Sequence, residues 1–118
     1  MKDKNIASTK SFDFALRIIK LVEYLKLERK EFLLSKQVMR SGTSIGANIE
    51  EAIGAQSRKD FHAKVSIAYK EARETHYWLR LLRESEYLPE SAADSIIQDC
   101  DEILKILGSI KKTTQDAS

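Results

Sequence analysis

The chain has 118 residues, of which 42% are hydrophobic and 32% charged, a composition typical of one soluble globular domain and not of a disordered chain. No apolar run approaches the roughly 20 residues of a membrane span, and MKDKNIASTK lacks an apolar stretch of signal-peptide length, so we expect a cytoplasmic protein without a membrane partner. The single cysteine excludes an internal disulfide and a multi-cysteine metal site within one chain, and the net charge of +2 is too small to indicate nucleic-acid binding by itself.

The first helix is predicted from Ser11 to about Leu27, after a flexible N-terminal arm over residues 1–10. Ser11 is a preferred N-cap residue, and Asp13 is favourable in a first turn. Two apolar stripes overlap on this helix: Phe12, Leu16, Ile19 and Val22 form one, and Phe14, Ile18, Leu21 and Leu25 form the other. Because the outer helix of a monomer needs only one stripe, we expect this helix to be buried on much of its circumference.

The second helix is predicted from about Lys30 to Ala55, and it contains the unusual stretch RSGTSIGANIEEA at residues 40–52. Glycine costs a helix about 1 kcal/mol relative to alanine, so this stretch needs a compensating contact. Gly42 and Gly46 lie one turn apart on one face, where they favour close packing of a large residue from another helix. The candidates on the third helix are Phe61, Tyr69, Tyr77 and Trp78.

Further residues of this stretch are assigned to the same packing role. Asn48 is expected to bond across helices and fix their register, Ser44 adds little bulk, and Glu51 is expected to pair with Arg40 or with an arginine of the third helix. The alternative is a ligand groove with exposed backbone, for instance for phosphate, although GTSIG lacks the Gly-Lys-Ser/Thr end of a Walker motif and follows no strand. On the packing interpretation, Gly46→Leu overfills a tight contact and costs about 1–3 kcal/mol.

The third helix is predicted from about Arg58 to Glu86, after a C-cap at Gly54. Ser57 with Asp60 forms the S-x-x-D pattern of a helix start. The helix has a seam with the 4-3 spacing of bundle packing, formed by Phe61, Val65, Ala68, Ala72, Thr75, Leu79 and Leu82.

The fourth helix is predicted after Pro89, with Ser91 as its cap and a frayed tail over residues 111–118. Its seam consists of Ala93, Ile96, Cys100, Ile103, Leu107 and Ile110. Four helices with short connections predict an all-α fold, a single antiparallel up-down-up-down four-helix bundle over residues 11–110. The second apolar stripe of the first helix, together with Ile67, Trp78 and Leu81, exceeds what one small core requires, which favours a homo-oligomer.

The run RSGTSIGANIEEA, followed by SRKDF and by SIAYKEARETHYWLRLL, resembles the bacterial four helix bundle protein family. The founding members of this family are encoded in intervening sequences within 23S ribosomal RNA genes. The resemblance covers roughly residues 10–108 and rests on an S-I-x-A-N-I-x-E core at residues 44–51. The run from Glu50 to Gly54 replaces an Ala-Glu-Gly run common in other members, which indicates a subfamily.

This resemblance implies an antiparallel left-handed four-helix bundle. Known relatives assemble as ring-like homopentamers, so the resemblance implies a pentamer here. A similar protein accompanies the reverse transcriptases of diversity-generating retroelements, where it binds the transcriptase and nucleic acid. Most members have no established biochemical activity.

A basic stripe on the third helix is the candidate nucleic-acid site. It follows the core seam by one position and consists of His62, Ser66, Tyr69, Arg73, His76, Arg80 and Arg83. Arg58 and Lys59 extend it at the preceding turn. Arginine forks onto phosphates, and tyrosine and histidine offer stacking platforms. The alternatives are a solvated face or an interface with acidic residues of the fourth helix, namely Asp94, Asp99, Asp101 and Glu102.

The sequence contains no convincing motif for a catalytic site or a metal site. A di-iron bundle needs Glu-x-x-His motifs, whereas Glu74 and His76 are only two positions apart and lie on different faces. His62 and His76 are about 21 Å apart along a helix, so they do not share a metal within one chain. Cys100 is expected to be a small buried hydrophobe. Glu50 and Glu51 have no evident acid–base partner. We therefore expect no metal and no cofactor.

The sequence thus predicts a non-enzymatic homo-oligomer that binds RNA or a nucleic-acid-processing protein through the basic stripe. The second hypothesis is a structural adaptor whose basic stripe contacts an acidic protein surface, with no nucleic-acid role. A third is an enzyme with a site in the bundle core, which requires titratable groups that face inward.

Overall fold

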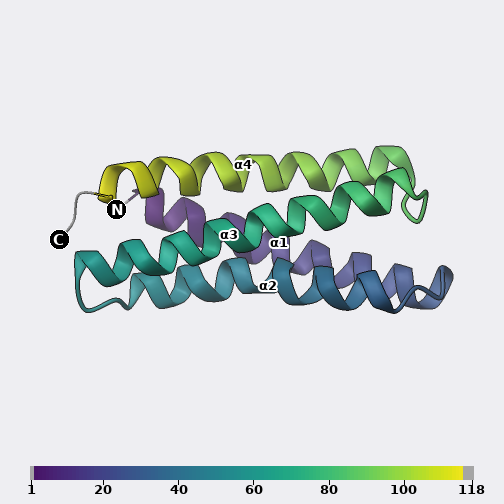
Figure 1. Cartoon of the computed structure of the whole chain (residues 1–118), viewed down its shortest axis with the longest axis horizontal. Helices are drawn as coiled ribbons and strands as arrows, with labels where there is room; N and C mark the ends of the chain where they lie inside the picture. The colour runs from purple at the N-terminus through teal and green to yellow at the C-terminus, as the bar shows by residue number, and fades with distance from the viewer. Residues whose placement is uncertain (1, 116–118) are drawn as a thin grey trace.

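The computed structural model describes residues 2–115, and in that range it contains helices only (Figure 1). The four helices are α1 (Lys2–Glu28), α2 (Leu33–Ile53), α3 (Arg58–Glu84) and α4 (Glu90–Thr114). They lie lengthwise in a body of 47 × 20 × 19 Å. Helix α1 packs against α2 and α4, and α3 packs against the same two helices. This arrangement confirms the predicted all-α four-helix bundle.

The core follows the predicted seams closely. Every seam residue predicted on α3, from Phe61 to Leu82, is buried, and so is every one predicted on α4, from Ala93 to Ile110. On α1 the buried apolar residues after Ala7 are Phe14, Ile18, Val22 and Leu25. Burying an aliphatic or aromatic side chain contributes about 1.5–3 kcal/mol, so these seams are the main source of stability.

The predicted start of α1 was wrong, because the helix begins at Lys2 and not at Ser11. Ala7 is buried at the end of the core, beside Ile49 and Phe61, so the residues before Ser11 have apolar surface to cover. Ser11 is not a cap: it is buried within the helix, and its Oγ donates a hydrogen bond of 2.7 Å to the Ala7 carbonyl. The flexible arm predicted for residues 1–10 is therefore helical from Lys2 onward.

The other helix ends show which sequence signals were reliable. Ser57 caps α3 as predicted, since its Oγ accepts a hydrogen bond of 3.0 Å from the Asp60 backbone N–H. Helix α4 begins at Glu90, directly after Pro89, so the predicted cap at Ser91 was wrong. The α4 helix continues to Thr114, which is buried, so part of the predicted frayed tail is helical; residues 116–118 lie outside the described range.

Helix α2 has an unpredicted cap. The Glu31 carboxylate accepts hydrogen bonds from the backbone N–H groups of Leu33, Leu34 and Ser35, at 3.2, 3.0 and 2.8 Å. A carboxylate at this position satisfies amides that have no partner within the helix and suits the helix dipole. Gly54 ends α2 as predicted. Within residues 2–115, no helix combines the length and the apolar character needed to cross a membrane.

Candidate functional site

The glycines of α2 pack against α1 and not against α3. A Cβ atom at Gly42 would lie 2.8 Å from Cγ1 of Ile18, and a Cβ at Gly46 would lie 3.5 Å from the Ser11 carbonyl oxygen. The prediction of close helix packing is therefore right at Gly42, but the expected aromatic partners on α3 were wrong. An aliphatic side chain of the preceding helix fills the space instead.

The polar side chains of this stretch bond mostly within α2. Thr43 Oγ1 donates to the Met39 carbonyl at 2.7 Å, Ser44 Oγ donates to the Arg40 carbonyl at 2.6 Å, and Asn48 Nδ2 donates to the Ser44 carbonyl at 2.8 Å. The predicted cross-helix bond of Asn48 was therefore wrong. The stretch is also continuous helix, whose amides are bonded within the helix, so the phosphate-groove alternative has no free backbone to offer.

One buried hydroxyl pair joins α2 to α3. Thr75 Oγ1 donates to Ser41 Oγ at 2.8 Å, and both residues are buried. This pair performs the cross-helix role that the sequence analysis gave to Asn48. Its members were passed over because serine in a small-residue stretch and threonine in a seam carry no distinctive signal of bonding to each other.

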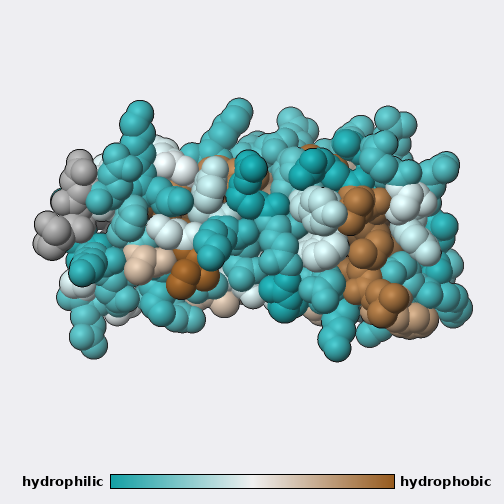
Figure 2. Space-filling view, viewed as in Figure 1, coloured by the Kyte–Doolittle hydropathy of each residue, from teal (hydrophilic) through white to brown (hydrophobic). Residues whose placement is uncertain are grey.

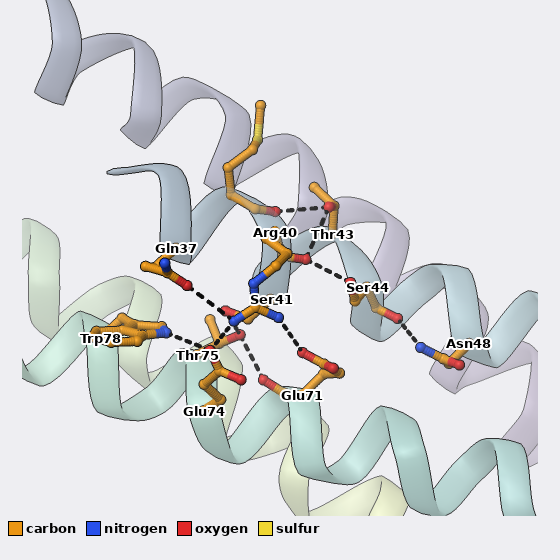
Figure 3. Close-up of polar contacts among 11 residues, drawn as sticks. Gln37, Arg40, Ser41, Thr43, Ser44, Asn48, Glu71, Glu74, Thr75 and Trp78 are labelled. Carbon is orange, nitrogen blue, oxygen red and sulfur yellow. Dashed lines mark hydrogen bonds and ion pairs between the residues drawn. The ribbon is translucent and has the colours of Figure 1, made fainter. Parts of the chain in front are cut away.

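A polar network covers the outer seam between α2 and α3 (Figure 3). The Arg40 guanidinium reaches from α2 to Glu71 and Glu74 on α3, at 3.4 Å from Glu71 Oε1, and the indole N–H of Trp78 donates to Glu74 at 2.9 Å. Glu51 pairs with Lys64 at 3.1 Å, in place of the predicted arginine. These contacts fix one edge of the Trp78 ring.

The predicted basic stripe divides at the seam between α3 and α4. His76 Nε2 lies 2.9 Å from Asp101 Oδ1. The Arg83 guanidinium donates to Asp94 Oδ1 and to Glu84 Oε2, each at 2.8 Å. These hydrogen bonds, the one to Asp94 most strongly, raise the pKa of Arg83. The alternative in which α4 carboxylates pair with the stripe is therefore observed within the chain for His76 and Arg83. The other two predicted α4 carboxylates, Asp99 and Glu102, bind α1 instead, at Arg17 and Lys10.

The remaining members of the predicted stripe have different surroundings. Tyr69 is half-buried beneath the Lys111 ammonium, which lies 4.5 Å from the ring centre. His62 contacts Thr114 at 2.7 Å, and Arg58 donates to the Thr113 carbonyl at 3.0 Å. Ser66 is half-buried, and Lys59 is exposed at the start of α3. These positions do not form one continuous cationic face.

Arg73 and Arg80 of the predicted stripe face solvent beside two exposed residues outside it, and we call these four residues the α3 outer stripe: Lys70, Arg73, Tyr77 and Arg80. Its three cations are exposed, and none forms an ion pair with any side chain in the described part of the chain. The Arg80 guanidinium lies 5.8 Å from the centre of the Tyr77 ring. Lys70 and Tyr77 were missed, although both stand two positions after a core residue, where a helix turns toward solvent.

A second exposed feature lies on α1, and we call it the α1 outer stripe: Phe12, Leu16 and Ile19, which are 63, 49 and 38% exposed. The expected burial of α1 on much of its circumference therefore does not occur within one chain. Three large apolar side chains in a row at helical spacing form the kind of contiguous patch that commonly marks a contact with another chain.

Cys100 is buried in the core, as predicted. Burial raises the pKa of the Cys100 thiol to about 12, with smaller contributions from Asp101 and Asp99, so the thiol is neutral at physiological pH. Its sulfur lies 3.4 Å from the Ala72 carbonyl oxygen. Among the described residues, no three His, Cys, Asp or Glu side chains gather in a way that suits a metal ion.

Comparisons with known proteins place this bundle in a family. The family model of the 23S rRNA-intervening sequence protein matches residues 3–109. A crystal structure from Bacteroides thetaiotaomicron VPI-5482, described as a protein of unknown function from the S23 ribosomal protein family, is 54% identical in sequence. The match covers 93% of this chain and 98% of that one, with a TM-score of 0.91. The comparison with curated proteins gives no match. The chain belongs to the 23S rRNA-intervening sequence protein family.

Proposed function

We propose that this protein is a non-enzymatic, cytoplasmic homo-oligomer that binds RNA through the α3 outer stripe. The observation that carries this proposal is the state of the three cations in that stripe. Lys70, Arg73 and Arg80 are exposed and have no carboxylate partner among the described residues. Such groups can bind phosphate without first breaking an ion pair, and each bound phosphate releases counterions.

Self-association is the second part of the proposal, and the α1 outer stripe supports it. Phe12, Leu16 and Ile19 would each leave water on contact with another copy, at about 25 cal/mol per Å² of apolar surface buried. Repetition of the subunit also repeats the α3 outer stripe, so that its charge adds along a bound RNA. The family resemblance leads us to expect a pentamer.

Salt-dependent RNA binding tests the proposal. We would compare the Arg73→Ala/Arg80→Ala protein with a matched control, Lys20→Ala/Lys105→Ala, which removes from α1 and α4 two exposed cations that form no ion pair with another described residue. For single strands the slope of log K against log salt is about −0.7 for each phosphate neutralised. The α3 variant should bind RNA more weakly, with a slope flatter by about 1.4 per binding surface. The control should keep the wild-type slope, and an equal loss in both variants would refute the assignment to α3.

The alternative function is that of an adaptor for an acidic protein surface. It is favoured by the residues around the α3 outer stripe, since tyrosine, tryptophan and arginine are enriched at the energetic centres of protein interfaces. The same two variants distinguish the alternatives. The adaptor role requires two results. The wild type should bind no RNA at about 50 mM salt, and the Arg73→Ala/Arg80→Ala variant should lose a protein partner that the wild type binds.

A further inference from the structure

We infer that the α3 outer stripe recognises single-stranded RNA, with an unpaired base stacked on Tyr77. This inference rests on the proposed function and names the form of its ligand. It depends on three features of the surface around Tyr77, which are the exposed ring, the support behind it and its apolar flank.

The Tyr77 ring is available for stacking. The residue is 48% exposed, and its position on α3 falls between Arg73 and Arg80 on the same side of the helix. One helical turn separates the ring from each arginine, a rise of about 4.5–6 Å. The Arg80 guanidinium lies over the ring, 5.8 Å from its centre, and the exposed Arg73 lies one turn before Tyr77, so a nucleotide stacked on the ring would have a cation on either side along the helix. Cations beside an exposed aromatic ring are the recurring design of single-strand binding surfaces.

A fixed aromatic neighbour supports the ring from behind. Trp78 meets Tyr77 edge to face, with the ring centres 5.2 Å apart and the planes at 65°. The indole N–H is held by Glu74, which Arg40 binds in turn from α2 (Figure 3). The platform is thus held in place before any ligand arrives, which lowers the entropy lost on binding.

The flank of the platform is apolar. Figure 2 shows an apolar band that crosses from the last turns of α3 to the first turns of α2. The exposed leucines of these two segments are Leu81, at 36%, and Leu33, at 80%. A single strand can place the faces of its bases on such a surface. A duplex buries those faces in its own stack and presents mainly phosphates and 2′-hydroxyl groups. The cations alone would suit either form, but the aromatic and apolar groups suit only unpaired bases.

The test compares two RNA probes on the full-length protein. One is an oligouridylate of about 12 nucleotides, and the other is an RNA duplex of the same length. We expect tighter binding of the oligouridylate. Tyr77→Ala should weaken its binding by about 5- to 150-fold, because stacking on an aromatic side chain contributes that much per base. The salt slope and the affinity for the duplex should stay unchanged, since no cation is lost. Tyr77→Phe, which keeps the ring, should bind like the wild type.

The chain offers a direct readout of stacking at this point. Trp78 is its only tryptophan and contacts Tyr77, so a base stacked there should quench the tryptophan fluorescence, whereas the duplex should leave the emission unchanged. The helix content and the mass in solution of Tyr77→Ala should match the wild type, because Tyr77 lies outside the buried core.

Three results would overturn the inference, and each is distinct. If both probes bind equally and Tyr77→Ala has no effect while Arg73→Ala/Arg80→Ala weakens binding, stacking is wrong and the proposed function stands. If Tyr77→Ala changes the mass of the oligomer, the ring belongs to an assembly contact. If the wild type binds neither probe at low salt, the inference and the proposed function fail together.

Discussion

Arg80 and Arg83 lie one turn apart on α3, and they differ in what surrounds them. Arg83 turns toward α4, where Asp94 accepts one of its hydrogen bonds, and its neighbour on α3, Glu84, accepts another. Arg80 turns toward solvent, where its only aromatic or charged contact among the described residues is the Tyr77 ring. The same contrast separates His76, paired with Asp101, from Arg73, which has no ion pair within the described part of the chain. The residue type of a surface cation therefore says little about binding, because its neighbours decide whether the charge is available.

The same comparison applies to the apolar residues of α1, and it leads to the largest expected effect. Phe14 and Ile18 are fixed in the core, whereas Phe12 and Leu16 are exposed in one chain. We expect Phe12→Asp/Leu16→Asp to abolish self-association, since burial of an unpaired charge in an interface is strongly unfavourable. Light scattering should give the monomer mass, and circular dichroism should give an unchanged helix content. Lys105→Asp on α4 is the control, and an unchanged oligomer in the α1 variant would exclude this stripe from the interface.

The two glycines of α2 offer a matched pair with a smaller effect. A Cβ at Gly42 meets the buried, β-branched Ile18 at 2.8 Å, whereas a Cβ at Gly46 makes only ordinary contacts at 3.5 Å or more. Gly42→Ala should destabilise the fold by about 1 kcal/mol net, because overpacking outweighs the gain in helix propensity. Gly46→Ala should be neutral or stabilising by up to about 1 kcal/mol. Urea unfolding measures both, and the reverse order would contradict the packing described for α1 and α2.

The smallest effect comes from releasing Arg83. Asp94→Asn/Glu84→Gln removes the two carboxylates that bind it, while the arginine itself remains. If its neighbours are what make Arg83 unavailable, the variant should gain about one phosphate contact and steepen the salt slope of RNA binding by about 0.7. The variant Asp94→Asn/Glu84→Gln/Arg83→Ala is the control. An equal steepening in that control would show that general charge, and not Arg83, causes the change.

The fold was largely predictable because the heptad-like seams carry an unambiguous periodic signal. Leu79 and Cys100 are buried as their spacing requires. Helix ends were predicted less well, since Ser11 has the residue type of a cap but occupies the middle of a helix. The partner of Gly42 was also missed, because a glycine within a helix indicates a close contact with another helix but not which helix makes it.

The candidate site was less predictable than the fold, because the sequence does not show which residues of other helices lie beside each cation. Spacing alone puts Arg73, Arg80 and Arg83 on one stripe, and neighbouring stripes on one helix differ by a single position. The placement of α4 brings Asp94 to Arg83, whereas Arg80 has no ion pair with any residue that the structure describes. Tyr77 was predicted to pack on the glycines of α2, but those glycines face α1 and the Tyr77 side chain is exposed.

The most direct measurement is the affinity of Arg80→Ala and of Arg83→Ala for the oligouridylate, each over a range of salt. We expect Arg80→Ala to bind more weakly, with a slope flatter by about 0.7, and Arg83→Ala to bind like the wild type. Equal losses, or a loss confined to Arg83→Ala, would contradict the claim that the solvent-facing side of α3 is the binding surface.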